Sequence, residues 1–246
     1  MEHNIESTKE TILTPYNSRI NDMITEFDHI KEKEPERAFE IIKEASNCGN
    51  VYAQLKYCKF LRTTPNLHIE QFTRYHEAER LLLGLFNLLD IPQTFCVDVA
   101  LELAVLYSEY LHRPVGALGM YLFARRLGGT IDEYNLQYLK KKMMKSDIRV
   151  LGKNYHDSLL LGQELQHAGG MTRLAEFFLR EAVDGAYAAI DRKENGSILA
   201  YAHAALTLGD FYDNLSDDNM LFRTERDKLY AVAKAYGYPE YLRKEK

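Results

Sequence analysis

The chain has 246 residues, of which 46% are hydrophobic, with only 6 prolines and a formal net charge of −5. This composition excludes a disordered chain, because it supplies enough apolar surface for a sizeable core. The acidic balance argues against a nucleic-acid or anionic-membrane binder, since such proteins are normally basic.

The first ten residues show no secretory signal, and the longest apolar run, Leu81 to Leu89, is too short to cross a bilayer. We therefore expect no membrane insertion. The three cysteines do not form a CxxC pair, which is typical of reduced thiols in a cytoplasmic protein.

Helical periodicity dominates the sequence, and short breaks containing Pro or Gly divide it into helix-length pieces. In chain order, helices are predicted over residues 16–32, 35–47, 51–62, 69–89, 95–112, 115–127, 131–145, 148–167, 171–184, 197–214 and 219–236. Pro35 and Pro114 are expected in first helical turns, where the missing N–H costs nothing. The fold class is therefore predicted to be all-α, as a single helical-repeat domain over residues 1–246 with a capping segment over 1–34.

A nine-residue pattern recurs on alternate predicted helices. A small or short residue is followed by Leu four positions later, a tiny residue five later and Tyr eight later. The clearest copy is Ala204, Leu208, Gly209, Tyr212, and the second is Val99, Leu103, Ala104, Tyr107. The third, Asp157, Leu161, Gly162, Leu165, ends in Leu instead of Tyr, and Ala53, Tyr57, Cys58, Leu61 is a degraded fourth. These offsets fall on one stripe of a helix, and the tiny residue lets a neighbouring helix approach closely. Repetition of such a unit indicates stacked antiparallel helical hairpins.

A second pattern marks the helices between these copies. An aromatic or aliphatic residue precedes a small contact residue and a terminal glycine that is expected to form a left-handed cap. The copies are Tyr121, Ala124, Gly128; Tyr230, Ala233, Gly237; Phe178, Ala182, Gly185; and Ile42, Ala45, Gly49.

The two patterns resemble the Sel-like repeat, a relative of the tetratricopeptide repeat. Its first helix reads A-x3-LG-x2-Y, which Ala204 to Tyr212 fits throughout, and the Gly49-Asn50 junction fits the connection between repeats. The first-helix copies begin at residues 53, 99, 157 and 204, so successive units are 46, 58 and 47 residues long, against 34 in a tetratricopeptide repeat. The resemblance implies an α-solenoid-like array with a concave binding face. An irregular all-α domain is the alternative.

By analogy with the tetratricopeptide relative, positions three, seven, ten and eleven of each first-helix copy are expected on the concave face. The predicted groove residues are Leu55, Lys59, Arg62 and Thr63; Leu101, Val105, Ser108 and Glu109; Leu159, Gln163, Gln166 and His167; and Leu206, Asp210, Asp213 and Asn214. Leu occupies position three in every copy, and the remaining positions change from basic to acidic along the chain. We therefore predict an apolar floor and a charge gradient that fixes the direction of a bound segment.

The predicted function is a non-enzymatic protein-interaction module or adaptor that binds a peptide or partner helix. Two alternatives stay open: an inhibitor or immunity-type protein with one enzyme partner, and an all-α enzyme with a pocket between helices. Neither a catalytic residue nor a cofactor is expected, because the sequence contains no phosphate-binding glycine loop, nucleophile elbow or zinc motif.

Three Glu-x2-His pairs have the spacing used by di-iron bundles: Glu26 with His29, Glu109 with His112, and Glu164 with His167. The last two lie at predicted helix ends, where the helix dipole favours His. We expect no metal site from them.

Two further features suit contact with a partner. The basic run from Lys140 to Lys145, with Arg149 and Lys153 beyond it, is either a contact for an acidic or phosphate-bearing partner or a solvated helix end. The chain has 17 tyrosines and no tryptophan. Those without a role in the repeat pattern form an interaction surface or fill crevices between helices: Tyr75, Tyr134, Tyr138 and Tyr155.

Overall fold

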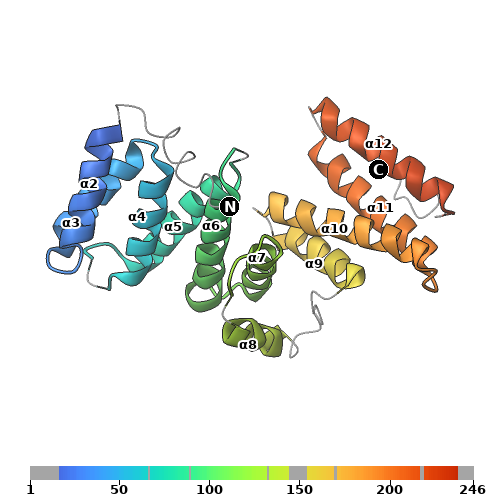
Figure 1. The fold of residues 1–246 in the computed structure, drawn as a ribbon, viewed down its shortest axis with the longest axis horizontal. Helices are drawn as coiled ribbons and strands as arrows, with labels where there is room; N and C mark the ends of the chain where they lie inside the picture. Colours follow the sequence, from blue (N-terminus) through green and yellow to red (C-terminus); the bar gives the residue numbers. More distant parts are fainter. Residues whose placement is uncertain are drawn as a thin grey trace, which may run out of the picture. The chain divides into compact units, whose positions relative to one another are not determined.

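The computed structural model describes residues 17–65, 67–88, 90–131, 133–143, 154–168, 171–216 and 219–237. These residues form eleven α-helices and one π-helical turn, and no strand lies among them (Figure 1). The predicted all-α class is therefore confirmed. No helix in these ranges combines the length and the apolar character that crossing a membrane requires.

In chain order, the helices are α2 (Asn17–Ile30), α3 (Pro35–Asn47), α4 (Val51–Thr63), α5 (Gln71–Phe86), α6 (Gln93–Val105), the π-helical turn η1 (Leu106–Tyr110), α7 (Pro114–Arg126), α8 (Glu133–Met143), α9 (Tyr155–Ala168), α10 (Thr172–Asp191), α11 (Ser197–Leu215) and α12 (Met220–Ala235). Pro35 and Pro114 occupy the first turns of α3 and α7, as predicted.

The chain divides into two compact units, unit 1 (Met1–Leu111) and unit 2 (His112–Lys246). In unit 1, each helix from α2 to α6 packs against the next one along the chain. In unit 2, α7 packs against α8 and α9, and α9 to α12 pack in chain order. This sequential packing is what stacked hairpins require within each unit. The single domain over 1–246 stays a prediction.

The nine-residue pattern marks the buried stripe of its helices. Tyr57, Tyr107 and Tyr212 are no more than 1% exposed. The tiny residues lie at helix contacts: a Cβ added to Gly162 would come within 2.7 Å of Leu179 Cγ, and one on Gly209 within 2.7 Å of Tyr230 Cε1. The predicted close approach of α9 to α10 and of α11 to α12 is therefore confirmed.

Three of the predicted glycine caps are present. Gly49, Gly128 and Gly237 have φ values of 79°, 83° and 83°, a left-handed conformation that glycine adopts without a steric penalty. The prediction that Gly185 ends a helix is wrong, because α10 continues to Asp191. Gly185 instead faces α9, and a Cβ there would lie 2.7 Å from Tyr155 Cβ.

The helix predicted over 95–112 also ends differently. The α-helical pattern stops at Val105 and continues as η1, in which the Leu111 N–H donates to the Leu106 carbonyl at 2.9 Å. His112 then takes a φ of 53°, and the next helix starts at Pro114. A π turn often accompanies functional positions and is not encoded by apolar spacing.

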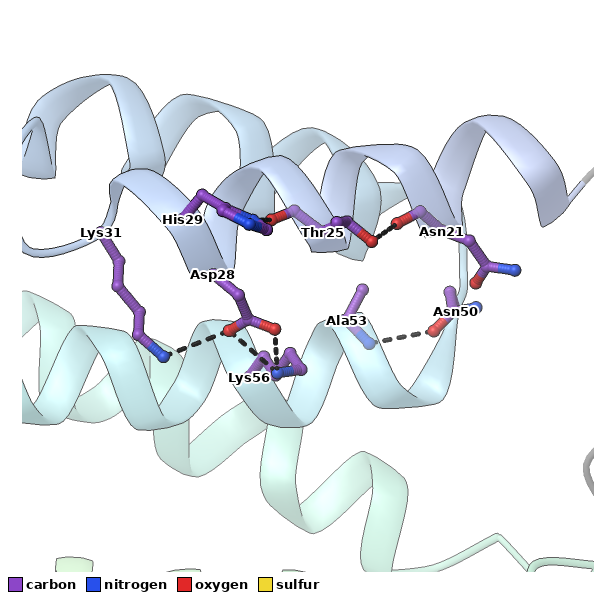
Figure 2. Close-up of polar contacts among 8 residues, drawn as sticks. All are labelled: Asn21, Thr25, Asp28, His29, Lys31, Asn50, Ala53 and Lys56. Atoms are coloured by element: carbon purple, nitrogen blue, oxygen red, sulfur yellow. Dashed lines mark hydrogen bonds and ion pairs between the residues drawn. The ribbon is translucent and has the colours of Figure 1, made fainter.

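Helix α2 contacts α4 through an ion pair. Figure 2 shows Asp28 of α2 between two lysines: Lys56 of α4 lies 2.8 Å away and Lys31 3.1 Å away. Nearby, Asn50 caps α4 by accepting the Ala53 N–H at 2.9 Å. Of the predicted capping segment, residues 1–16 lie outside the described residues, so that prediction stays open.

Candidate functional site

Two of the four predicted groove positions have the same burial in all four copies. Position ten is half-buried every time, and position eleven is exposed every time. The position-ten residues are Arg62, Ser108, Gln166 and Asp213, and the position-eleven residues are Thr63, Glu109, His167 and Asn214. The four copies therefore share one register relative to the core, although their spacing along the chain varies.

The predicted apolar floor is less uniform. Leu55 of α4 and Leu159 of α9 are buried, so they belong to the core of their units. Leu101 of α6 and Leu206 of α11 are half-buried and reach the surface. Only the second and fourth copies, with Leu101 and Leu206, therefore have a partly exposed leucine at position three.

The burial of the position-seven residue also differs between the copies. Lys59 of α4 and Asp210 of α11 are exposed, whereas Val105 and Gln163 are half-buried. Asp210 accepts a hydrogen bond from the Tyr230 hydroxyl of α12 at 2.8 Å. Lys59 is the more exposed of the two basic residues predicted for the groove of unit 1, and Arg62 is the other.

Arg62 pairs with Glu102 of α6 through two contacts, Nε to Oε1 at 2.5 Å and Nη2 to Oε2 at 3.3 Å. The two side chains are 16% and 7% exposed, and the guanidinium lies 5.7 Å from the ring centroid of Tyr110. Burial lowers the pKa of Arg62, but the bonds to Glu102 outweigh it, so the pKa lies above its ordinary value. The charge of Arg62 is therefore compensated within the chain.

Asp213 has the corresponding role in unit 2. Its carboxylate lies 2.9 Å from Nη1 of Arg226 on α12. Hydrogen bonds to Asp213 and Asp227 raise the pKa of Arg226. Two of the charges that define the predicted gradient, one at each end, are thus partly neutralised by a neighbouring helix. The gradient itself stays a prediction.

Three tyrosines from three successive segments of unit 2 lie in a row, which we call the tyrosine row. The ring of Tyr187 on α10 lies 5.3 Å from that of Tyr201 on α11, and Tyr201 lies 5.1 Å from Tyr236, directly after α12. Tyr187 is 51% and Tyr236 39% exposed. Ile198, one turn before Tyr201, is 53% exposed. The three rings form a connected aromatic surface.

The hydroxyl of Tyr201 stays protonated over the physiological range. Burial, then Tyr236, Tyr187 and Asp184, raise its pKa above the ordinary value of 10.0. The row therefore offers a hydrogen-bond donor between two partly exposed rings.

Reasoning from the sequence missed the tyrosine row, although a signal was present. Tyr187 and Tyr201 each lie seven positions from Glu194, which is in the loop between α10 and α11. An antiparallel hairpin turning at this loop places the two residues opposite each other. Because the helix was predicted to end before Gly185, Tyr187 was not placed on it, and its position opposite Tyr201 was missed.

The four tyrosines outside the repeat patterns divide into two groups. Tyr75 is 8% exposed and packs on Tyr110 with ring centroids 4.7 Å apart, and half-buried Tyr155 packs on Gly185, so both fill crevices. Tyr134 and Tyr138 of α8 are 75% and 53% exposed.

The Glu-x2-His pairs are not brought together as a chemical site. Glu26 pairs with Arg37 at 2.6 Å, and His29 Nδ1 lies 2.7 Å from the Thr25 carbonyl (Figure 2). Over the described ranges, His, Cys, Asp and Glu do not gather in threes around a possible metal position. Burial raises the pKa of the Cys58 thiol, which keeps it protonated and poorly nucleophilic.

Comparisons with protein-family models, with curated proteins and with solved structures gave no match for this chain. The resemblance to the Sel-like repeat therefore depends on the residues of the chain alone.

Proposed function

We propose that the chain is a non-enzymatic protein-interaction module or adaptor, built from Sel-like helical hairpins, that binds a peptide segment or partner helix. The observation that supports this most is the tyrosine row. Tyrosine gives a large, rigid contact area at low entropic cost and is enriched at interface hot spots. Three such rings held at fixed spacing by three helical segments form a preorganised surface.

The exposed groove positions add polar groups to the surface of each unit separately. Lys59, Glu109, His167 and Asn214 offer polar contacts on the first-helix faces. Polar contacts at a rim mainly steer the partner and fix its register. We place the protein in the cytoplasm, because its free cysteines include two buried thiols, Cys58 and Cys96.

Site-specific photo-crosslinking in cells tests this proposal. A photoreactive phenylalanine analogue replaces Tyr187 in one variant and Tyr52 of unit 1, which is 40% exposed, in a matched control. We expect position 187 to capture a defined protein that position 52 does not. Replacing Tyr201 and Tyr236 by Ala in the position-187 variant should abolish the capture while leaving its far-UV circular dichroism unchanged.

Identical capture from both positions, or capture that survives loss of the other two tyrosines, would refute the proposed role of the row. If the captured partner is an enzyme whose activity falls on binding, the protein acts as an inhibitor rather than an adaptor. The identity of the partner thus separates the two roles.

A further inference from the structure

Helix α8 has one face in the core and one face at the surface. Leu136 and Leu139 are 0% and 1% exposed, and α8 packs against α7. Tyr134 and Tyr138 lie on the outer side together with exposed Lys141. The offsets of four and seven residues place these three side chains on one stripe about 10 Å long.

This stripe leads into a strongly basic end of the helix. Three consecutive lysines, Lys140 to Lys142, close α8, and its only acidic residue is Glu133. Glu133 pairs with Arg125 of α7 at 3.3 Å, so its charge is already compensated. Lysines in a last turn also favour the helix dipole, but that effect does not account for two exposed tyrosines on the same stripe.

We propose that the exposed stripe of α8, formed by Tyr134, Tyr138 and Lys141 at the lysine-rich end of the helix sequence, binds an acidic segment of a partner protein. The tyrosine rings supply apolar contact and hydroxyl donors, and Lys141, in a helix with only one acidic residue, supplies charge complementarity. A short segment suits the patch because the stripe spans only about two helical turns.

The overall charge separates this partner from other anions. The whole chain carries −5, a net charge that disfavours binding of a long polyanion such as RNA or of an anionic membrane. A segment of a few acidic residues stays within about one Debye length, roughly 8 Å at physiological salt, of the lysines. The local positive charge therefore dominates for a short acidic peptide.

This surface is independent of the tyrosine row, because the two share no residue or helix. Variants of one leave the other intact, so the two proposals fail separately.

Fluorescence anisotropy on the full chain tests the inference. The probe is a fluorescein-labelled peptide of four glutamates interspersed with two leucines. One variant carries Gln at Lys140, Lys141 and Lys142, and the other carries Ala at Tyr134 and Tyr138. The matched controls carry Gln at three lysines of other elements, Lys33, Lys193 and Lys228, and Ala at Tyr52.

We expect the α8 lysine variant to lose about tenfold or more in affinity for the peptide, and the α8 tyrosine variant to weaken it severalfold. Raising the salt from 50 to 300 mM should weaken the wild-type complex in the same direction. The controls should bind like wild type.

Equal loss in the lysine control would mean that only net charge matters, which overturns the proposal. So would a wild-type chain that does not bind the peptide, or binding that both α8 variants retain. Tighter binding to a twelve-residue uridine oligonucleotide or to phosphatidylserine vesicles than to the peptide would likewise contradict it.

Discussion

Gly209 offers a direct test of the helix contact on which the repeat register depends. It lies in the middle of α11, and an added Cβ would meet Tyr230 Cε1 at 2.7 Å and Cδ1 at 2.8 Å. Gly84 lies in the last turn of α5, with nothing within 4 Å of such a Cβ. Comparing Gly to Ala at these two positions therefore separates the effect of helix propensity on stability from the effect of packing.

At Gly84 only propensity acts, and Ala is better than Gly in a helix by about 1 kcal/mol. At Gly209 the same gain is opposed by overpacking against the Tyr230 ring, which typically costs about 1–3 kcal/mol. We therefore expect Gly84→Ala, in the last turn of α5, to raise the free energy of unfolding by up to about 1 kcal/mol. Gly209→Ala should lower it by up to about 2 kcal/mol, and Gly209→Leu should lower it further.

Urea unfolding followed by circular dichroism measures both changes. Repeating Gly209→Ala in a Tyr230→Ala background completes a double-mutant cycle, and the penalty should disappear when the ring is absent. Equal stabilisation by Ala at positions 84 and 209 would show that α11 and α12 do not meet at Gly209, and the proposed register would be wrong.

Two further predictions concern ion pairs. Burial opposes ionisation of Asp28, but hydrogen bonds from Lys56 and Lys31 outweigh it and lower its pKa below 3.8. The folded-state pKa is depressed, so Asp28 stabilises the fold above about pH 4 and loses this contribution as the pH falls through the folded pKa. Thermal melts should show Asp28→Asn less stable than wild type at pH 7 and equal to it at pH 2; a constant gap would contradict the assignment. For the buried pair, Arg62→Met should cost about 3 kcal/mol because Glu102 is left uncompensated, and adding Glu102→Leu should recover most of that loss in urea unfolding. Additive losses in the double variant would exclude direct coupling.

The sequence predicted the buried stripes well because they depend on local spacing. Leu208, Gly209 and Tyr212 recur at offsets that only one face of a helix can satisfy, so their burial follows from periodicity. Gly185 shows where this reasoning stops. A glycine late in a predicted helix can either end the helix or allow another helix to pack closely against it. Gly185 does the second, because it contacts Tyr155, which is thirty positions away in the sequence.

The candidate site was less predictable for a related reason. Periodicity places Arg62 on a face of α4, but its partner Glu102 is forty positions away and on another helix. Whether such a charge faces solvent or a neighbour is decided by tertiary packing rather than by local pattern. The tyrosine row has the same origin, because it appears only when the lengths of α10 and α11 are known.

The burial pattern also changes which groove residues suit a binding test. Position ten is half-buried in every copy, and in two of them, Arg62 and Asp213, it fastens one helix to another. Reversing the charge of Arg62 would place a carboxylate against Glu102 and destabilise unit 1, so lost binding would not report on the groove. Position eleven is exposed in every copy, from Thr63 to Asn214. Substitutions of Glu109 and His167, together with Lys59, alter exposed side chains, and they are the changes best suited to separate recognition from folding.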